Sequence, residues 1–212
     1  MNGQRKFLNI GMASAFALFL ISLIAPLYIT VGGENAASVL FSRIPGMDLR
    51  FNAFDRISIV SFFVFLTVFF VCHALYEQKT IRKIFSALSA LYSIGYLTIL
   101  ALVGTNGLVI NNFPVISIPL WLVVGSKFSI LLPAMYFFSV SADKGLSVFV
   151  RTSAFLHSVS LTLILVIKLF EIYLTLSVRA MVFDISISLY FITLAMVTFF
   201  MYRKYYSDED EL

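Results

Sequence analysis

The sequence predicts an all-α fold, a polytopic transmembrane helix bundle of about six spans. Hydrophobic residues make up 60% of its 212 positions, charged residues make up 12%, and the mean hydropathy is +0.98. A soluble domain carries about 25% charged residues, roughly twice this share. The apolar residues also fall into six long runs, and a helix of about 20 residues is enough to cross the hydrocarbon core.

We predict one transmembrane domain over residues 1–212, and the first span keeps its place in the mature protein. Arg5 and Lys6 precede the first run, as they would in a signal peptide. That run is about 25 residues, longer than a typical signal h-region, and no small-x-small cleavage site ends it. The predicted spans are 7–31, 57–75, 84–103, 115–140, 152–176 and 180–202.

The distribution of basic residues predicts that both termini are cytoplasmic, in the plasma (inner) membrane. Cytoplasmic connections of membrane proteins are enriched in Lys and Arg. With the N-terminus inside, nine cations are cytoplasmic, five are external and Lys127 lies within a span. The cytoplasmic set is Arg5, Lys6, Lys79, Arg82, Lys83, Lys144, Arg151, Arg203 and Lys204, and the external set is Arg43, Arg50, Arg56, Lys168 and Arg179.

One connection, residues 32–56, is long enough to have a structure of its own. It opens with Gly32-Gly33 and is interrupted by Pro45-Gly46, and apolar residues alternate there with charged ones. Such a mixture favours an outer loop that lies on the membrane interface. A lid over an outward-facing cavity is the alternative.

Lys127 is the first candidate functional residue, because it lies inside the apolar run 114–140. An ammonium group at bilayer depth costs several kcal/mol unless it is paired or hydrated. Pro119 and Pro133 flank it, and each removes a backbone hydrogen bond that water or a polar neighbour must replace. Lys127 therefore predicts either an internal ion pair or a polar pocket. Gly125-Ser126-Lys127 does not complete a phosphate-binding loop, whose G-x-x-x-x-G-K-[ST] pattern is absent.

The last two spans carry polar stripes at helical spacing, which are expected to face the bundle interior. We predict that Lys127, His157, Ser160 and Asp184 line a polar cavity between the fourth, fifth and sixth spans. In the alternative, His157 is a hydrogen-bonded packing residue, and Lys168 pairs with Glu171 at a helix end. The stripes are Ser153, His157, Ser160, Ile164, Lys168 and Glu171, and then Asp184, Ser188, Phe191, Ala195 and Thr198.

No metal, cofactor or nucleic-acid site is predicted. The chain has two histidines, His73 and His157, and one cysteine, Cys72, without the spacing of a zinc site. A haem held by both histidines is a minor alternative, since each lies in the cytoplasmic half of its span. The cations are scattered in ones and twos, with no basic stripe for nucleic acid.

Small residues on the first span predict close helix packing, within the protein or against a membrane partner. They form two pairs at i, i+4 spacing, Gly11 with Ala15 and Ala13 with Ala17. In size, orientation and the Ala13-x-x-x-Ala17 face, the chain resembles the substrate-binding subunits of energy-coupling-factor transporters. It departs from them in having few glycines in the second and fifth spans, and no substrate motif matches. The resemblance implies a solute-binding subunit that works with a partner.

Three classes of function follow from these residues. A non-catalytic membrane subunit that binds a small solute or a partner, as sensor and transporter components do, fits the compact bundle without a soluble domain. An intramembrane enzyme or an ion or proton channel, using Lys127 and His157, is the alternative. The enzyme is disfavoured because no nucleophile–base pair or carboxylate pair is apparent from the spacing.

Overall fold

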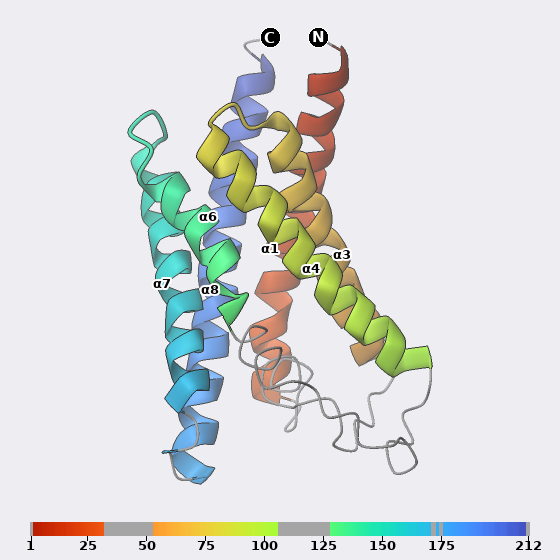
Figure 1. Ribbon diagram of the computed structural model, residues 1–212, viewed down its shortest axis with the longest axis vertical. Coiled ribbons are helices and arrows are strands. Elements are labelled where there is room, and N and C mark those ends of the chain that lie inside the picture. Colours follow the sequence, from red (N-terminus) through yellow and green to blue (C-terminus); the bar gives the residue numbers. More distant parts are fainter. Residues whose placement is uncertain (1, 32–52, 106–127, 171–172, 174–175, 211–212) are drawn as a thin grey trace.

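A computed structural model of the chain is all-helical throughout the residues it describes, which are 2–31, 53–105, 128–170, 173 and 176–210. This confirms the all-α part of the predicted fold class. Figure 1 shows long helices that run alternately up and down, side by side. Their bounds are α1 Asn2–Val31, α3 Ala53–Tyr76, α4 Thr80–Thr105, α6 Leu131–Ser141, α7 Val148–Phe170 and α8 Leu176–Asp210.

The helices form a closed ring in chain order. Each packs against the next, from α1 through α3, α4, α6 and α7 to α8, and α8 packs back against α1. Both termini and the α3–α4 and α6–α7 connections lie at the same end of the bundle (Figure 1). The described helices have 23 to 35 residues each, except α6, whose described part has 11.

Several helix boundaries differ from the predicted ones. Residues 53–56, expected in the outer loop 32–56, already belong to α3, and Asp55 near its start favours a helix N-terminus through the helix dipole. The fifth span was expected to reach residue 176, but α7 ends at Phe170 and Leu176 already begins α8. Residues 32–52, the rest of the predicted loop, lie outside the described residues.

The predicted span 115–140 contains a helix break. α6 begins only at Leu131, after a turn at residues 129–130, and the Leu132 N–H donates to the Ser129 carbonyl over 3.1 Å. Pro133 has no N–H to donate and is tolerated best in the first turn of a helix, where it lies here. The proline therefore accounts for the interruption of this span.

The bundle exposes many large apolar side chains and buries many polar ones within a core that is itself largely apolar. Large apolar residues on every helix are exposed, while serine, threonine and histidine side chains are buried. A soluble monomer rarely exposes a contiguous apolar patch above a few hundred Å². The buried hydroxyl and imidazole residues are Ser14, Ser22, His73, Ser86, Ser89, Ser93, Ser153, His157, Ser158, Ser160, Ser186, Thr193 and Thr198.

Within the described residues, one helical segment, Val148–Ile167, is long and apolar enough to cross a membrane, with a mean hydropathy of 1.7 over 20 residues. By itself a single segment is weak support for a membrane protein, since a core helix of a soluble protein has the same properties. Shorter apolar stretches occur in other helices, at Phe7–Leu23, Val60–Tyr76, Leu131–Ser141 and Ser188–Arg203.

Two helical glycines provide a matched test of the packing of α1 against α3. A Cβ on Gly11 would lie 3.3 Å from the Cys72 Cβ on α3, whereas a Cβ on Gly95 in α4 would meet nothing within 4 Å. Alanine normally stabilises a helix by about 0.5–1 kcal/mol relative to glycine. We expect Gly95→Ala to show this gain and Gly11→Ala to lose it through crowding. Equilibrium unfolding in mixed micelles measures both, and equal gains would contradict the close approach of α1 and α3.

Candidate functional site

Two of the four predicted site residues, His157 and Ser160, meet in a buried hydrogen-bonded cluster between α7 and α8. His157 Nδ1 lies 2.9 Å from Thr193 Oγ1, and Ser160 Oγ lies 3.0 Å from the same atom. Ser160 also donates to the His157 carbonyl over 2.8 Å, and Thr193 to the Leu189 carbonyl over 2.8 Å. Thr193 was not among the predicted residues, because at 3.6 residues per turn it lies about 180° around the helix from the expected stripe.

Aromatic rings close around this cluster. The His157 imidazole is 1% exposed, and it meets the Phe137 ring edge to face at 4.7 Å between centroids. On its other side the Tyr190 ring lies at 5.1 Å. An imidazole held by a hydroxyl and two rings is a packed, oriented group, which agrees with the packing alternative for His157.

The other two predicted residues are not described. Lys127 lies outside the described residues, and α8 contains Asp184 without a description of its side chain. On α7, Ser153, His157, Ser160 and Ile164 are all buried, so the described part of the expected stripe faces inward. The polar cavity between the fourth, fifth and sixth spans stays a prediction.

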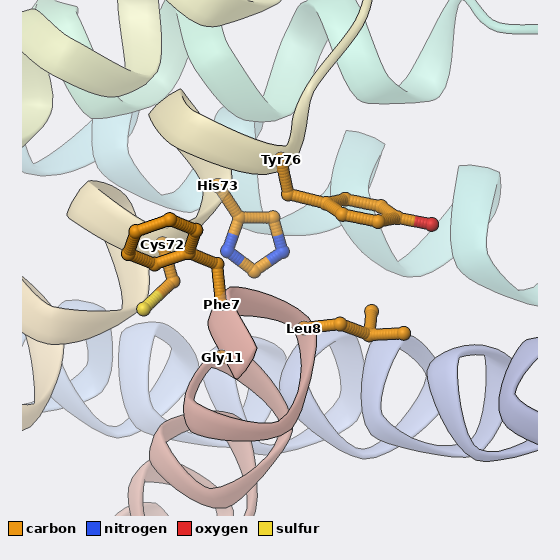
Figure 2. A pocket seen from close by; sticks show the side chains of 6 residues that line it. All are labelled: Phe7, Leu8, Gly11, Cys72, His73 and Tyr76. Atoms are coloured by element: carbon orange, nitrogen blue, oxygen red, sulfur yellow. The ribbon is translucent and has the colours of Figure 1, made fainter. Parts of the chain in front are cut away.

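A small cavity lies between α1 and α3, near the end of the bundle that holds the termini. It measures about 10 Å³, which suits a single water molecule. Figure 2 shows the His73 imidazole between Phe7 and Tyr76, above α1. His73 Nδ1 lies 2.7 Å from the Phe69 carbonyl and its ring lies 4.1 Å from the Phe69 ring. The lining residues are Phe7, Leu8, Gly11, Cys72, His73 and Tyr76.

The two histidines contact different members of one aromatic cluster, formed by Phe69, Tyr136 and Phe137. His73 contacts Phe69 and Tyr136, whereas His157 contacts Phe137 and Thr193. Across the described part of the chain, no group of three or more His, Cys, Asp or Glu side chains is placed to hold a metal ion.

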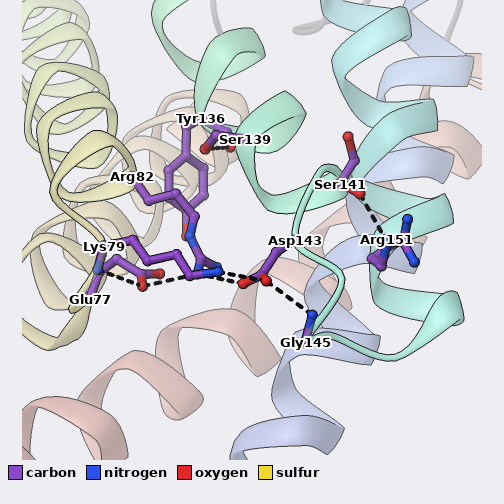
Figure 3. A network of polar contacts seen from close by, with 9 residues as sticks. All are labelled: Glu77, Lys79, Arg82, Tyr136, Ser139, Ser141, Asp143, Gly145 and Arg151. Carbon is purple, nitrogen blue, oxygen red and sulfur yellow. Dashed lines mark hydrogen bonds and ion pairs between the residues drawn. The ribbon is translucent and has the colours of Figure 1, made fainter.

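A charged network joins the α3–α4 connection to the α6–α7 connection (Figure 3). Asp143 Oδ2 accepts from the Arg82 guanidinium at 2.6 Å, and Asp143 Oδ1 pairs with Lys79 Nζ at 2.6 Å. The Gly145 N–H donates to Oδ1 over 3.0 Å, and Glu77 pairs with Arg82 at 3.3 Å. Arg82 and Asp143 are 61 residues apart along the chain, so their contact links two helix hairpins.

The distribution of these cations predicted the orientation in the membrane, but their pairing with Asp143 was not predicted. The available signal was Asp143, an acid that precedes Lys144 in the α6–α7 connection, with Arg151 in the first turn of α7. Arg82 is 8% exposed, and a buried guanidinium requires a partner that lies close in space. Helical periodicity cannot predict such a partner, because the partner comes from a different hairpin.

The surroundings of Asp143 give the protein an acid-sensitive contact. The hydrogen bond from Lys79, with those from Gly145 and the charge of Arg82, lowers the pKa of Asp143 below its ordinary 3.8, against a smaller opposing effect of burial. A lowered folded-state pKa adds stability above the unfolded pKa, and this stability disappears as the pH falls through the folded value. We expect unfolding free energy to drop below about pH 4.

The control for this acid dependence is Asp143→Asn. The variant carries no titrating group at the position, so the difference between wild type and variant should shrink as the pH falls from about 6 to about 3. Unfolding titrations over this range measure it. A constant difference would show that Asp143 does not titrate at a lowered pKa.

The small residues of α1 divide between the interior and the surface. Gly11 and Ala15 are buried, Ala13 is exposed and Ala17 is half-buried. The Gly11 and Ala15 face is thus used inside the bundle, against α3 at Gly11. The predicted partner contact through the four residues is untested, and the Ala13 side of α1 is the exposed one.

Thr193 provides a test of the polar cluster with a built-in control. Thr193→Val keeps the side-chain shape and leaves His157 and Ser160 without their shared partner, so we expect a loss of about 1–2 kcal/mol of stability. Thr98 on α4 also donates to the carbonyl four residues earlier, over 3.0 Å, but it is exposed. Thr98→Val should change stability by less than about 0.5 kcal/mol. Equal effects would exclude a special role for the cluster.

Comparison with known proteins finds nothing similar: no family model, no curated protein and no solved structure matches the chain.

Proposed function

We propose that the chain is a polytopic integral membrane protein of six spans in the plasma (inner) membrane, with both termini in the cytoplasm. The observation that carries this is the side-chain distribution, with large apolar residues exposed on every helix and serine, threonine and histidine buried among them. Lipid solvates an apolar exterior at no cost, and buried hydroxyls then hydrogen-bond to carbonyls within the bundle.

The charge distribution supports the proposed orientation. Lys79, Lys83 and Lys144 lie in or beside the connections at the end of the bundle that holds both termini. Excess Lys and Arg on one face of a membrane protein marks the cytoplasmic side.

Within this membrane body, we assign the chain the role of a non-catalytic subunit that binds a small solute or a membrane partner. In the described region, the inward polar side chains His157, Ser160 and Thr193 hydrogen-bond to one another. All three side chains are buried, and both hydroxyls donate to backbone carbonyls, so none is presented to a substrate, which favours binding over catalysis. The proposed ligand contacts are Lys127 and Asp184, the other two residues of the predicted cavity.

The experiment is gentle purification from native membranes, with mass spectrometry of everything that co-elutes. A stoichiometric protein or a retained small molecule supports the proposal. If neither co-elutes and the purified protein conducts ions in reconstituted vesicles, the result would favour a channel instead.

The matched variants for a retained solute are Lys127→Met and His157→Phe. We expect Lys127→Met to abolish the rise in melting temperature that the solute produces. If both variants leave that rise and the basal stability unchanged, the predicted cavity is wrong.

A further inference from the structure

We propose that the cytoplasmic end of this bundle binds the headgroup of an anionic phospholipid, at a basic rim formed by the α3–α4 and α6–α7 connections and the first turns of α4 and α7. The inference rests on the proposed membrane location. The basic rim consists of Lys79, Arg82, Lys83, Lys144 and Arg151.

The basic rim carries more positive charge than its own acids neutralise. Five cations face two carboxylates, Glu77 and Asp143, so the local net charge is 5 − 2 = +3. Both acids are engaged by Lys79 and Arg82, and Asp143 also accepts from Gly145. Lys83 and Lys144 are exposed and form no ion pair with any described residue. Two of the surplus charges are therefore these lysines.

The network holds Lys79 and Arg82 in place before a ligand arrives. Asp143 ties the α6–α7 connection to Arg82 of α4 (Figure 3), and Lys144 is the next residue of that connection. Arg151 is likewise fixed, because its Nε donates to the Ser141 carbonyl over 3.1 Å. Arg82 is only 8% exposed, and its Nε has no hydrogen-bond partner among the described residues. This Nε atom is buried, so the contacts offered to a headgroup are the exposed lysines Lys83 and Lys144.

Highly exposed apolar side chains adjoin the basic rim. At the start of α4, Ile81 is 65% exposed, and at the start of α7, Val148 and Phe149 are 69% and 68% exposed. Phe149 stacks on Phe200 of α8 at 5.5 Å between centroids, which fixes its ring at the surface. A basic cluster immediately next to an apolar surface matches the headgroup and acyl chains of one lipid. A free phosphate ion would use the cations alone.

The test is native mass spectrometry of the full chain in detergent, titrated with phosphatidylglycerol or with phosphatidylcholine of the same acyl chains. We expect tighter first binding of phosphatidylglycerol. Each Lys near a membrane surface contributes about fivefold to anionic-lipid affinity, so Lys83→Gln with Lys144→Gln should weaken phosphatidylglycerol about 25-fold. Phosphatidylcholine binding should stay the same.

The matched control is Arg5→Gln with Lys6→Gln, which removes the same charge at the same end of the bundle, on α1. If this control loses as much phosphatidylglycerol affinity as the rim variant, diffuse surface charge attracts the lipid and the proposal is overturned. So would the absence of a phosphatidylglycerol preference in the wild type, or full competition by glycerol phosphate at the same concentration. An acidic co-purifying protein that the rim variant releases, with lipid binding unchanged, would also overturn it.

The membrane location is checked separately, by extracting cell membranes at alkaline pH. A chain released from the membrane there contradicts the proposed function. A chain that is retained but shows no lipid preference contradicts the headgroup site alone.

Discussion

Replacing Asp143 with alanine is expected to lower the free energy of unfolding by about 3 kcal/mol, because it leaves Arg82 buried without its closest counter-ion. Both carboxylate oxygens are in use, by Lys79 and Gly145 on one side and Arg82 on the other. Glu77 at 3.3 Å would then be the remaining partner of Arg82. Equilibrium unfolding in mixed micelles measures the loss.

Lys79→Gln is the control for this network. Its side chain is 58% exposed, against 10% for Asp143, so water replaces much of the lost contact. Exposed ion pairs contribute about 0–1 kcal/mol, and we expect a loss in that range. If Asp143→Ala cost no more than Lys79→Gln, the network would not hold the two hairpins together.

His157→Ala is expected to cost about 3 kcal/mol, by removing a fully buried ring from the contact between α6, α7 and α8. Truncating a buried aromatic side chain to alanine costs roughly 3–5 kcal/mol through lost contacts and the resulting void. The imidazole touches Phe137 and Tyr190, and its loss also deprives Thr193 of a hydrogen bond. Thermal unfolding in detergent and lipid measures the effect.

His157→Phe separates packing from hydrogen bonding. A benzyl ring fills most of the same space, so we expect the loss to fall to about 1 kcal/mol, the value of the hydrogen bond. In a Thr193→Val background the same change should cost still less, because the bond is already absent. A His157→Phe variant as unstable as His157→Ala would assign the effect to hydrogen bonding alone.

The all-α part of the fold class could be predicted from the sequence, because composition and helical periodicity report on each helix alone. Residues 84–103 lie entirely within α4, and the inward face through Ser153, His157 and Ser160 could be read from spacing. The helix break before Pro133 could be expected from its missing N–H, though the position of the turn at 129–130 could not.

Contacts between helices were beyond this kind of reasoning. The pairing of Arg82 with Asp143 depends on how two hairpins meet, and neither residue marks its partner in the sequence. Thr193 was missed for the same reason, since its importance comes from the two α7 side chains that share its hydroxyl. The boundary between α7 and α8 was placed six residues late because the apolar pattern continues past Phe170.

The most direct test of the membrane bundle is the sidedness of its connections. In a Cys72→Ser background, single cysteines replace Gln78 and Lys144, both exposed at the end that holds the termini, and Asn111 in the connection predicted on the other side. An impermeant maleimide should label the first two only after cells are opened and Asn111→Cys in intact cells. Labelling of Gln78→Cys and Lys144→Cys from opposite sides would contradict the account.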